Sequence, residues 1–344
     1  MNTTAETGQS GVAMAQRPVL VTGGAGFIGS NFVASLLSAE RADVIVLDQL
    51  GSDNLKWKNL AKHRVDDILP PAELENLLSG TRFSAVVHLG AISATTARDA
   101  DAVIAANFRL SKRLWQHCSE AGIPLLYASS AATYGDGAQG YSDDHTSEAL
   151  ARLRPQNLYG WSKHLFDTWA VNQVETNKPV PPQWIGLKFF NVYGPNEAHK
   201  GNMKSVFARF YEQCAAGDEV ELFRSHRAGI ANGAQQRDFV YVEDCVAVML
   251  WMLTHPTVNG IFNLGTGESC TFRAAIETLY DATGYPPKIR YVDMPKALRE
   301  HYQYFTKADI SRLRSIGYKA QFKSVDEGAR HYVKHYLATA DLHR

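Results

Sequence analysis

Short uninterrupted apolar runs, separated by helical patterns, characterise the first half of the chain. The runs are Pro18–Thr22, Val44–Leu47, Ala85–Leu89 and Leu125–Ala128. Between the first two, Phe27–Ala39 places its apolar side chains on one helical face. Runs that do not alternate with polar residues suit parallel strands covered on both faces. Because strands and helices alternate, we predict right-handed crossovers and a doubly wound parallel α/β sheet.

The pattern changes after Trp184–Phe190, a further strand-like run, and loop signals become frequent. Two more strand-like runs, Arg237–Val242 and Gly260–Leu264, then flank a helical pattern at Glu243–Leu253. We therefore expect the chain to leave the sheet and later to return to it, and 344 residues are enough for two lobes. The predicted division is a disordered tail (1–16), a Rossmann-type sheet domain (17–190 with about 239–265) and a smaller α/β substrate-binding domain (191–238 and 266–344).

Composition narrows the choice of partner. Lys+Arg and Asp+Glu both total 35, so the chain lacks the basic surplus that favours nucleic acid or an anionic membrane. No apolar stretch is long enough to span a membrane. The 4 cysteines are scattered, without the close pairs that hold zinc, and indicate reduced thiols in a cytoplasmic protein that binds no metal.

A glycine-rich run lies between the first predicted strand and the helix after it. Gly23, Gly26 and Gly29 are spaced three apart, and Phe27 and Ile28 open the helix. The first two glycines allow close backbone approach to a pyrophosphate, and the third lets helix and strand pack. Backbone N–H groups and the positive end of the helix dipole then face the phosphates. With a strand before it and a helix after it, this run predicts a dinucleotide site.

Residues near the second strand point to different dinucleotides. Asp48 closes that strand, followed by Gln49, and a carboxylate there accepts hydrogen bonds from the adenosine ribose hydroxyls, which favours NAD. Lys56 lies close enough in sequence to counter the 2′-phosphate of NADP. Alternatively, Asp48 caps a turn and Lys56 is a solvated surface charge.

Small residues follow the third strand, as Gly90-Ala91-Ile92-Ser93. They would let the nicotinamide half of a dinucleotide lie flat. Asn107, in the next helix, is placed to hold that loop, and a buried structural asparagine is the alternative.

A tyrosine and a lysine four residues apart, Tyr159 and Lys163, indicate chemistry at that dinucleotide. Residues i and i+4 share a helix face, so both side chains should enter one cleft, although a surface pair is the alternative. A phenolate can take the proton of a substrate alcohol as hydride leaves the carbon. Lowering a tyrosine pKa to neutrality needs about 4 kcal/mol, and one cation about 5 Å away supplies roughly 3 kcal/mol at an effective dielectric near 20. Ser130, after the strand, could hydrogen-bond the same oxygen.

Several longer stretches carry a family resemblance. They are Leu126–Gly135, Phe190–Pro195, His199–Gly201, Arg237–Val242, Ile261–Gly267 and Tyr302–Thr306. With the glycine run, they resemble the extended short-chain dehydrogenase/reductase family of nucleotide-sugar epimerases, dehydratases and reductases, from about Pro18 to the C-terminal region. His199–Gly201 and Tyr302–Thr306 are the more restrictive stretches, and resemble members that epimerise an ADP-linked heptose in lipopolysaccharide inner-core assembly.

The resemblance implies a mechanism with two bases. Hydride would leave C6 of the heptose for tightly held NADP⁺, and the transient aldehyde would turn before hydride returns to its opposite face. One base cannot easily serve the hydroxyl in both orientations, so the resemblance implies Tyr159 on one side and Lys200 on the other. From its residue type alone, Lys200 could instead be a phosphate clamp or an exposed charge. The resemblance also favours NADP over NAD, and implies a homo-oligomer, a pentamer.

For the nucleotide diphosphate, the resemblance implies residues spread over the second half of the chain. They are Asn191, Asn202, Arg209, Phe223, Ser225, Arg237 and Tyr302, with Ser130 at the reacting hydroxyl. Arginine suits phosphate because its planar fork donates two parallel hydrogen bonds, so Arg237 is the strongest candidate. Arg209 and Asn202 stand where family members can carry histidine and serine, and a solvated role is the alternative for both.

Some positions depart from the family pattern, and rival functions remain. Lys188 stands where many members carry arginine, and the stretches 136–157 and 227–236 are longer than the pattern requires, which leaves the sugar open. A UDP-hexose 4-epimerase would not need Lys200. A 4,6-dehydratase would carry an Asp-Glu pair where this chain has Ala131-Ala132. A non-catalytic NAD(P) sensor would have no need of the serine, tyrosine and lysine together.

Overall fold

The computed structural model describes residues 17–39, 43–52, 55–299 and 302–344. The expected tail at 1–16 lies outside this part of the chain.

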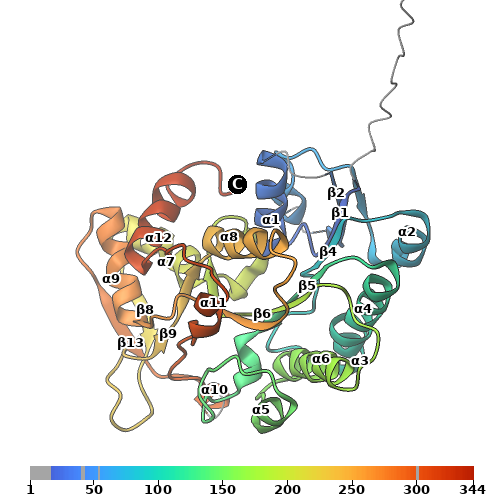
Figure 1. The fold of residues 1–344 in the computed structure, drawn as a ribbon. Coiled ribbons are helices and arrows are strands. Elements are labelled where there is room, and N and C mark those ends of the chain that lie inside the picture. The colour runs from blue at the N-terminus through green and yellow to red at the C-terminus, as the bar shows by residue number, and fades with distance from the viewer. Residues whose placement is uncertain (1–16, 40–42, 53–54, 300–301) are drawn as a thin grey trace, which may run out of the picture.

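A seven-stranded parallel sheet forms the centre of the molecule, in the order β11-β6-β5-β4-β1-β2-β3 (Figure 1). Its strands are β1 (Val19–Thr22), β2 (Val44–Leu47), β3 (Asp67–Leu69), β4 (Ala85–His88), β5 (Leu125–Ser130), β6 (Trp184–Phe189) and β11 (Gly260–Leu264). This order confirms the predicted doubly wound sheet of the Rossmann type. From β1 the chain adds β2 and β3 on one side, and then β4 and the later strands on the other side, so the strand order reverses between β1 and β4.

Helices cover both faces of the sheet, which is why its strands are apolar on both sides (Figure 1). One face packs against α1 (Phe27–Ser38), α8 (Val242–Leu253) and α11 (Ser311–Ser315). The other packs against α2 (Leu74–Gly80), α4 (Leu110–Ala121) and α6 (Leu158–Glu175). Shorter helices lie at α3 (Ala100–Ile104), α5 (Ser147–Arg152) and α10 (Lys296–Arg299). The predicted helices at α1 and α8 are confirmed to within one residue.

Strand β3 and helix α7 (Val206–Ala216) go beyond the predicted elements. Two of the three residues of β3 are exposed, so this edge strand has no apolar run to reveal it. In α7 the buried residues Phe207, Phe210 and Cys214 do follow a helical period, but loop signals surround them.

A second apolar core lies away from the large sheet, at the left of Figure 1. It is built by three short sheets and by α7, α9 (Phe272–Thr283) and α12 (Val325–Tyr332). The sheets pair β7 (Asn191–Tyr193) with β10 (Phe239–Tyr241), β8 (Val220–Phe223) with β13 (Ile289–Val292), and β9 (Gln236–Arg237) with β12 (Cys270–Thr271). The domain boundaries stay a prediction.

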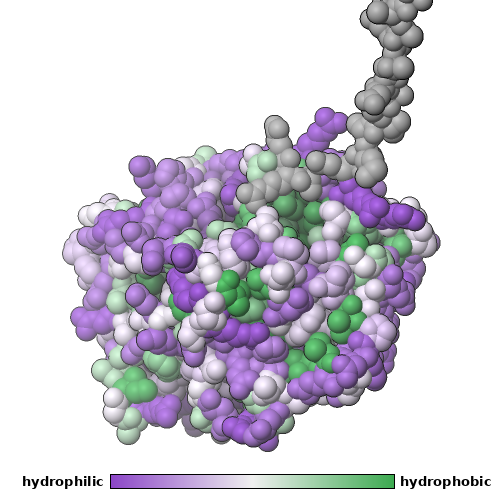
Figure 2. Space-filling model, in the orientation of Figure 1, coloured by the Kyte–Doolittle hydropathy of each residue, from purple (hydrophilic) through white to green (hydrophobic). Residues whose placement is uncertain are grey.

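The surface carries no large continuous apolar patch in the view of Figure 2, where green areas are small and separated. Within the described residues, no helix is both long and apolar enough to cross a membrane. All four cysteines are free thiols.

Candidate active site

The glycine-rich turn lies between β1 and α1, at the point where the strand order of the sheet reverses. Gly23 has a φ of +67°, and a Cβ there would come within 2.6 Å of the backbone N of Gly90, at the end of β4. A Cβ on Gly29 would lie 2.1 Å from the carbonyl oxygen of Gly23. Any side chain at these two positions would push the turn apart, so the turn after β1 stays free of side chains at the crevice where doubly wound sheets bind ligands.

Asp48 is bonded to the glycine turn itself. Its Oδ2 accepts a hydrogen bond from the Ala25 N–H at 2.9 Å, and its Oδ1 accepts from the Gln49 N–H at 2.7 Å. Lys56 Nζ forms an ion pair with the same Oδ1 at 2.5 Å. The two residues that pointed to different dinucleotides are therefore partners, and the ammonium offsets part of the carboxylate's repulsion of a phosphate.

Asn107 holds the loop after β4, as the sequence predicts. Its Oδ1 accepts from the Ile92 N–H at 2.8 Å, and its Nδ2 donates to the Ile92 carbonyl at 2.9 Å. Nδ2 also donates to Ser162 Oγ at 2.9 Å, so Asn107 joins the Gly90–Ser93 loop to α6. Its turn of helix, Ala105–Arg109, is π-helical.

His88, which sequence reasoning missed, continues this polar chain inward. Ser111 Oγ donates to the Asn107 carbonyl at 2.7 Å, so it accepts from His88 Nε2–H at 2.9 Å. His88 Nδ1 then accepts from Thr22 Oγ1 at 2.6 Å, the pattern of a neutral imidazole. Burial, with a smaller effect of the Lys163 cation, lowers the pKa of His88 to about 3. The sequence did carry one signal for this site, since His88 is a histidine that ends an otherwise apolar strand.

This neutral histidine makes stability depend on pH. Between the free histidine pKa near 6.5 and the folded value of about 3, only the unfolded chain binds the proton, so the stability is present above pH 6.5 and is lost as the pH falls. We expect the free energy of unfolding to fall by up to about 1.4 kcal/mol per pH unit from this group. Denaturant titrations of wild type and His88→Gln should converge as the pH drops from 7 to 5. A His255→Gln variant, at an exposed position, should follow the wild type; a constant gap for His88→Gln would contradict the assignment.

Tyr159 and Lys163 lie in the first two turns of α6. The helix begins there because the Asn157 side chain caps it, accepting from the Gly160 N–H at 2.8 Å. Lys163 is 3% exposed and Tyr159 is half-buried. Ser130 is the last residue of β5 and caps the 3-10 turn Ala131–Tyr134, accepting from the Ala132 N–H at 3.1 Å. Strand β5 and the start of α6 therefore bring serine and tyrosine together.

The electrostatics of Tyr159 differ from the sequence-based expectation. Burial raises the pKa of its phenol, and the hydrogen bond with Ser130 lowers it by less. Burial also lowers the pKa of Lys163 to about 8, while the Asp167 carboxylate opposes this. In the protein alone the net effect is a raised Tyr159 pKa, because burial costs the phenolate more than the Ser130 hydrogen bond returns. The expected lowering by Lys163 together with an oxidised nicotinamide ring stays a prediction.

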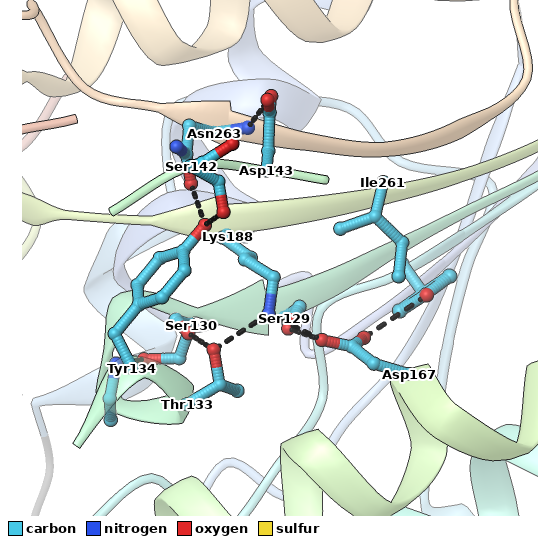
Figure 3. A network of polar contacts seen from close by, with 12 residues as sticks. Ser129, Ser130, Thr133, Tyr134, Ser142, Asp143, Asp167, Lys188, Ile261 and Asn263 are labelled. Atoms are coloured by element: carbon cyan, nitrogen blue, oxygen red, sulfur yellow. Dashed lines mark hydrogen bonds and ion pairs between the residues drawn. The ribbon is translucent and has the colours of Figure 1, made fainter. Parts of the chain in front are cut away.

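Beneath this site lies a buried network that sequence reasoning did not assemble (Figure 3). Asp167, one turn after Lys163, accepts hydrogen bonds from Tyr127 at 3.1 Å and from Ser129 at 2.6 Å. It also forms an ion pair with Lys188 at 3.0 Å. Lys188 was noted only as a departure from the family pattern, and its partner lies 21 residues away in sequence.

Lys200 lies beside the glycine turn. Its ammonium is 4.8 Å from the centre of the Phe27 ring, at the start of α1, and 4.0 Å from Glu197 Oε2. Burial lowers the pKa of Lys200, and Glu197 opposes that effect. The loop is fixed to the turn by Asn59, whose Nδ2 donates to the Ala25 carbonyl at 2.9 Å and lies 3.1 Å from His199 Nδ1.

Arg237 is a buried cation that forms no ion pair within the described part of the chain. It is 8% exposed, and its guanidinium lies 5.4 Å from the Phe272 ring centre and 5.3 Å from that of Tyr302. One hydrogen bond, to the Gln236 carbonyl at 2.8 Å, leaves most of its five donors available. Burial lowers its pKa. A buried guanidinium with free donors is suited to binding an anion.

The other residues predicted to bind substrate make fewer contacts with one another. Asn191, Asn202 and Arg209 are exposed, and Arg209 stacks on its neighbour Phe210. Phe223 is half-buried at the end of β8, and Ser225 Oγ donates to the Arg227 carbonyl at 3.2 Å in the following loop. Of this set, the structure brings Arg237 and Tyr302 into direct contact. The roles of all these residues stay predictions.

The doubly wound sheet, with a bare glycine turn where its strand order reverses, defines a dinucleotide-binding α/β protein. Residues 19–265 match the NAD dependent epimerase/dehydratase family, and the chain belongs to that family.

Similar proteins agree with this assignment. The chain is 46% identical over 328 residues to an ADP-L-glycero-D-manno-heptose-6-epimerase of Nitratidesulfovibrio vulgaris Hildenborough, covering 94% of this chain and 99% of that one. The crystal structure of the Helicobacter pylori ADP-L-glycero-D-manno-heptose-6-epimerase superposes with a TM-score of 0.76 at 26% identity, covering 93% and 96% of the two chains. A UDP-glucose 4-epimerase of Thermus thermophilus in complex with NAD has a TM-score of 0.70 at 26% identity, covering 92% and 98%.

Proposed function

We propose that the protein epimerises C6 of ADP-D-glycero-D-manno-heptose to the L-glycero isomer, by transient oxidation and re-reduction with bound NADP. The names of its relatives at 41–46% identity support this substrate. The observation that carries the proposal is the position of Lys200 beside Phe27. A second basic group next to the dinucleotide turn is what a two-base epimerisation needs.

The cofactor site fits a dinucleotide on the chain's own geometry. Gly23 and Gly29 leave a cradle that a Cβ would fill, and the N–H groups that open α1 face it. Asp48 and Gln49 would hold the adenosine ribose, and the Asp48–Lys56 pair supports NADP because its ammonium can also meet a 2′-phosphate. The loop from Gly90 to Ser93, held by Asn107, would face the nicotinamide. The bound cofactor supplies a hydride acceptor that becomes the donor for the return step.

Tyr159 is the proposed base for one orientation of the C6 hydroxyl. Its phenol shares a hydrogen bond with Ser130, which would also steady charge on the substrate oxygen. Lys163, with a pKa of about 8, keeps most of its positive charge near pH 7 and favours the phenolate. The positive charge of an oxidised nicotinamide ring would add to that effect.

Lys200 is the proposed base for the opposite orientation. A lysine must lose its proton to act as a base, and burial shifts its pKa in that direction. Glu197, 1% exposed, holds the ammonium in place while accepting from the Ser205 N–H at 2.6 Å. These two contacts of Glu197 restrict the position of the loop that carries Lys200.

Arg237 is proposed to bind the diphosphate, and replacing it should separate binding from stability. Arg237→Met keeps the apolar contacts with Phe272 and Tyr302 but removes a buried charge. We expect KM to rise about 10- to 150-fold, since a hydrogen bond to a charged group contributes about 1.5–3 kcal/mol. The melting temperature should not fall, because an unpaired buried cation costs free energy. Steady-state kinetics and calorimetry measure both; an unchanged KM would remove Arg237 from the diphosphate site.

Three broader features belong to the same proposal. The protein would divide into the sheet domain and the substrate-binding domain described above, with the site between them. It would act in the cytoplasm, and it would form a homo-oligomer, a pentamer by family resemblance. Sedimentation velocity of the purified protein measures the last of these directly.

The function is tested by NMR of the purified protein with ADP-D-glycero-D-manno-heptose, without added cofactor, following the C6 stereocentre. Conversion to the L-glycero isomer would establish the substrate, the chemistry and a retained cofactor together. An unchanged heptose with NADP⁺ or NAD⁺ supplied, alongside C4 epimerisation of UDP-hexoses, would overturn the substrate while keeping the family.

A further inference from the structure

Lys188 carries a charge inside the sheet, in the second strand from one edge. It lies in β6, between Ser129 of β5 and Asn263 of β11 in the strand register, and it is 1% exposed. Its ammonium donates to Thr133 Oγ1 at 2.7 Å and to Asp167 Oδ2 at 3.0 Å (Figure 3). A buried ammonium is costly, so two directed contacts on two other elements mark a connection with a specific geometry.

The first contact leads to the catalytic serine through a single hydroxyl. Thr133 Oγ1 accepts from Lys188 and donates to the Ser130 carbonyl at 2.8 Å. Thr133 belongs to the 3-10 turn that follows β5, and Ser130, the last residue of β5, caps that turn. The orientation of the Ser130 backbone is therefore fixed from β6 by two successive hydrogen bonds.

The second contact leads to the helix that carries the tyrosine and lysine. Asp167 lies one helical turn beyond Lys163 on α6, and it is fully buried. Ser129, the neighbour of Ser130, donates to the same carboxylate oxygen that Lys188 pairs with, at 2.6 Å. The carboxylate thus ties α6 to the end of β5 at the point where the serine begins.

The far end of the turn is held by a separate contact. Tyr134 donates to Asn263 Oδ1 at 2.6 Å, and its ring lies 4.9 Å from the Lys188 ammonium. Strands β11 and β6 thus hold the turn between Ser130 and Tyr134 directly, and helix α6 holds Ser129, the residue before it. A pair that served only to stabilise the core would not need to contact both the turn, at Thr133, and the residue before it, Ser129.

We propose that Lys188 and Asp167 are positioning residues, which together set the distance and orientation of Ser130 relative to Tyr159 and Lys163. The role in catalysis rests on the proposed epimerisation. The placement of the turn does not depend on that function, and it can be measured separately.

The charge of the pair supports the same role. After burial and the Ser130 hydrogen bond, the Asp167 carboxylate is a further influence on the Tyr159 pKa, and it raises it. The Lys188 cation, 3.0 Å from that carboxylate, offsets its field at the phenol. Removing the cation would therefore disfavour the phenolate as well as release the turn.

The test compares Lys188→Met with Lys188→Arg and with a matched buried control. Methionine keeps most of the side-chain length and removes the charge, whereas arginine restores a cation that can reach both partners. Gln183→Met is the control, since Gln183 is 1% exposed just before β6 and donates to the Met252 and Val258 carbonyls, away from the turn. We expect Lys188→Met to lower kcat about 10- to 100-fold, as expected for a misplaced reacting group. Its KM and cofactor content should stay within about twofold.

Lys188→Arg should recover most of the lost kcat, and Gln183→Met should lose melting temperature without losing kcat. A Lys188→Met enzyme with the wild-type kcat would overturn the proposal. So would a loss of kcat that arginine does not recover. If Lys188→Met does not fold, Thr133→Val tests the proposal instead, because it removes the hydroxyl that links Lys188 to Ser130 and leaves the Lys188–Asp167 ion pair intact. Thr133→Val should lower kcat about tenfold at constant KM. A wild-type kcat in this variant would refute the link.

Hydrogen exchange of residues 131–135 separates this proposal from the proposed function. Exchange in this turn should be faster in Lys188→Met than in Gln183→Met, whether or not the protein acts on ADP-heptose. If the wild type does not epimerise that sugar, the proposed function fails, and the exchange result alone judges the positioning. Equal exchange in the two variants would exclude it.

Discussion

Tyr159→Phe is expected to lower kcat for epimerisation about 10²- to 10⁴-fold while leaving the cofactor bound. The range is the usual contribution of a general acid or base, and phenylalanine removes only the hydroxyl that exchanges the proton. Because the hydroxyl is the group joined to Ser130, the packing of the ring should persist. Steady-state kinetics on ADP-D-glycero-D-manno-heptose, with the cofactor measured after denaturation, give both quantities.

A second tyrosine provides the control. Tyr280 is fully buried in the smaller core, and its hydroxyl donates to the Lys288 carbonyl at 2.9 Å. Tyr280→Phe should lower the melting temperature and keep kcat. If Tyr159→Phe kept more than a tenth of the wild-type rate, the phenol would not be a base in this reaction.

Lys200→Met is expected to slow epimerisation about 10²- to 10⁴-fold, and its defect should complement that of Tyr159→Phe. If each base serves one orientation of the C6 hydroxyl, each variant fails to oxidise one epimer and still oxidises the other. A single-turnover experiment with each pure epimer, followed at the absorbance of reduced nicotinamide, should show a burst with opposite epimers in the two variants.

The neighbouring Lys204→Met, half-buried in the same segment, should behave as wild type. A burst with the same epimer in both active-site variants would rule out the two-base assignment, even if both were slow. Wild-type turnover in Lys200→Met would remove that lysine from the mechanism and leave it as a group that stacks on Phe27.

Much of this architecture could be read from local patterns. The strands β1, β2, β4, β5 and β6 follow apolar runs, because a strand covered by helices on both faces leaves no polar face to interrupt the run. The glycine turn could be read because the spacing of its glycines, and the contact of Gly29 with Gly23, lie within seven residues, although the close approach of Gly90 to Gly23 does not. Asn107 was assigned to the following loop, and it does bond to Ile92.

Contacts between distant segments could not be read in this way. Asn59 joins the glycine turn to His199 over 140 residues, and nothing in its neighbourhood marks it. Lys188 and Asp167 each sit in an ordinary apolar stretch, and become partners only when β6 lies beside β5 beneath α6. Charge pairing across such separations depends on which elements the fold places together.

The sequence by itself therefore determined the sheet, the dinucleotide turn and the residue types of a hydride-transfer site, because each depends on spacing along one strand, turn or helix. Only the tertiary structure decided the environment of those residues. It raised the pKa of Tyr159 in the protein alone, because desolvation depends on everything packed around the phenol. It also brought Lys200 beside Phe27 and left Arg237 buried with no ion-pair partner among the residues that the structure describes.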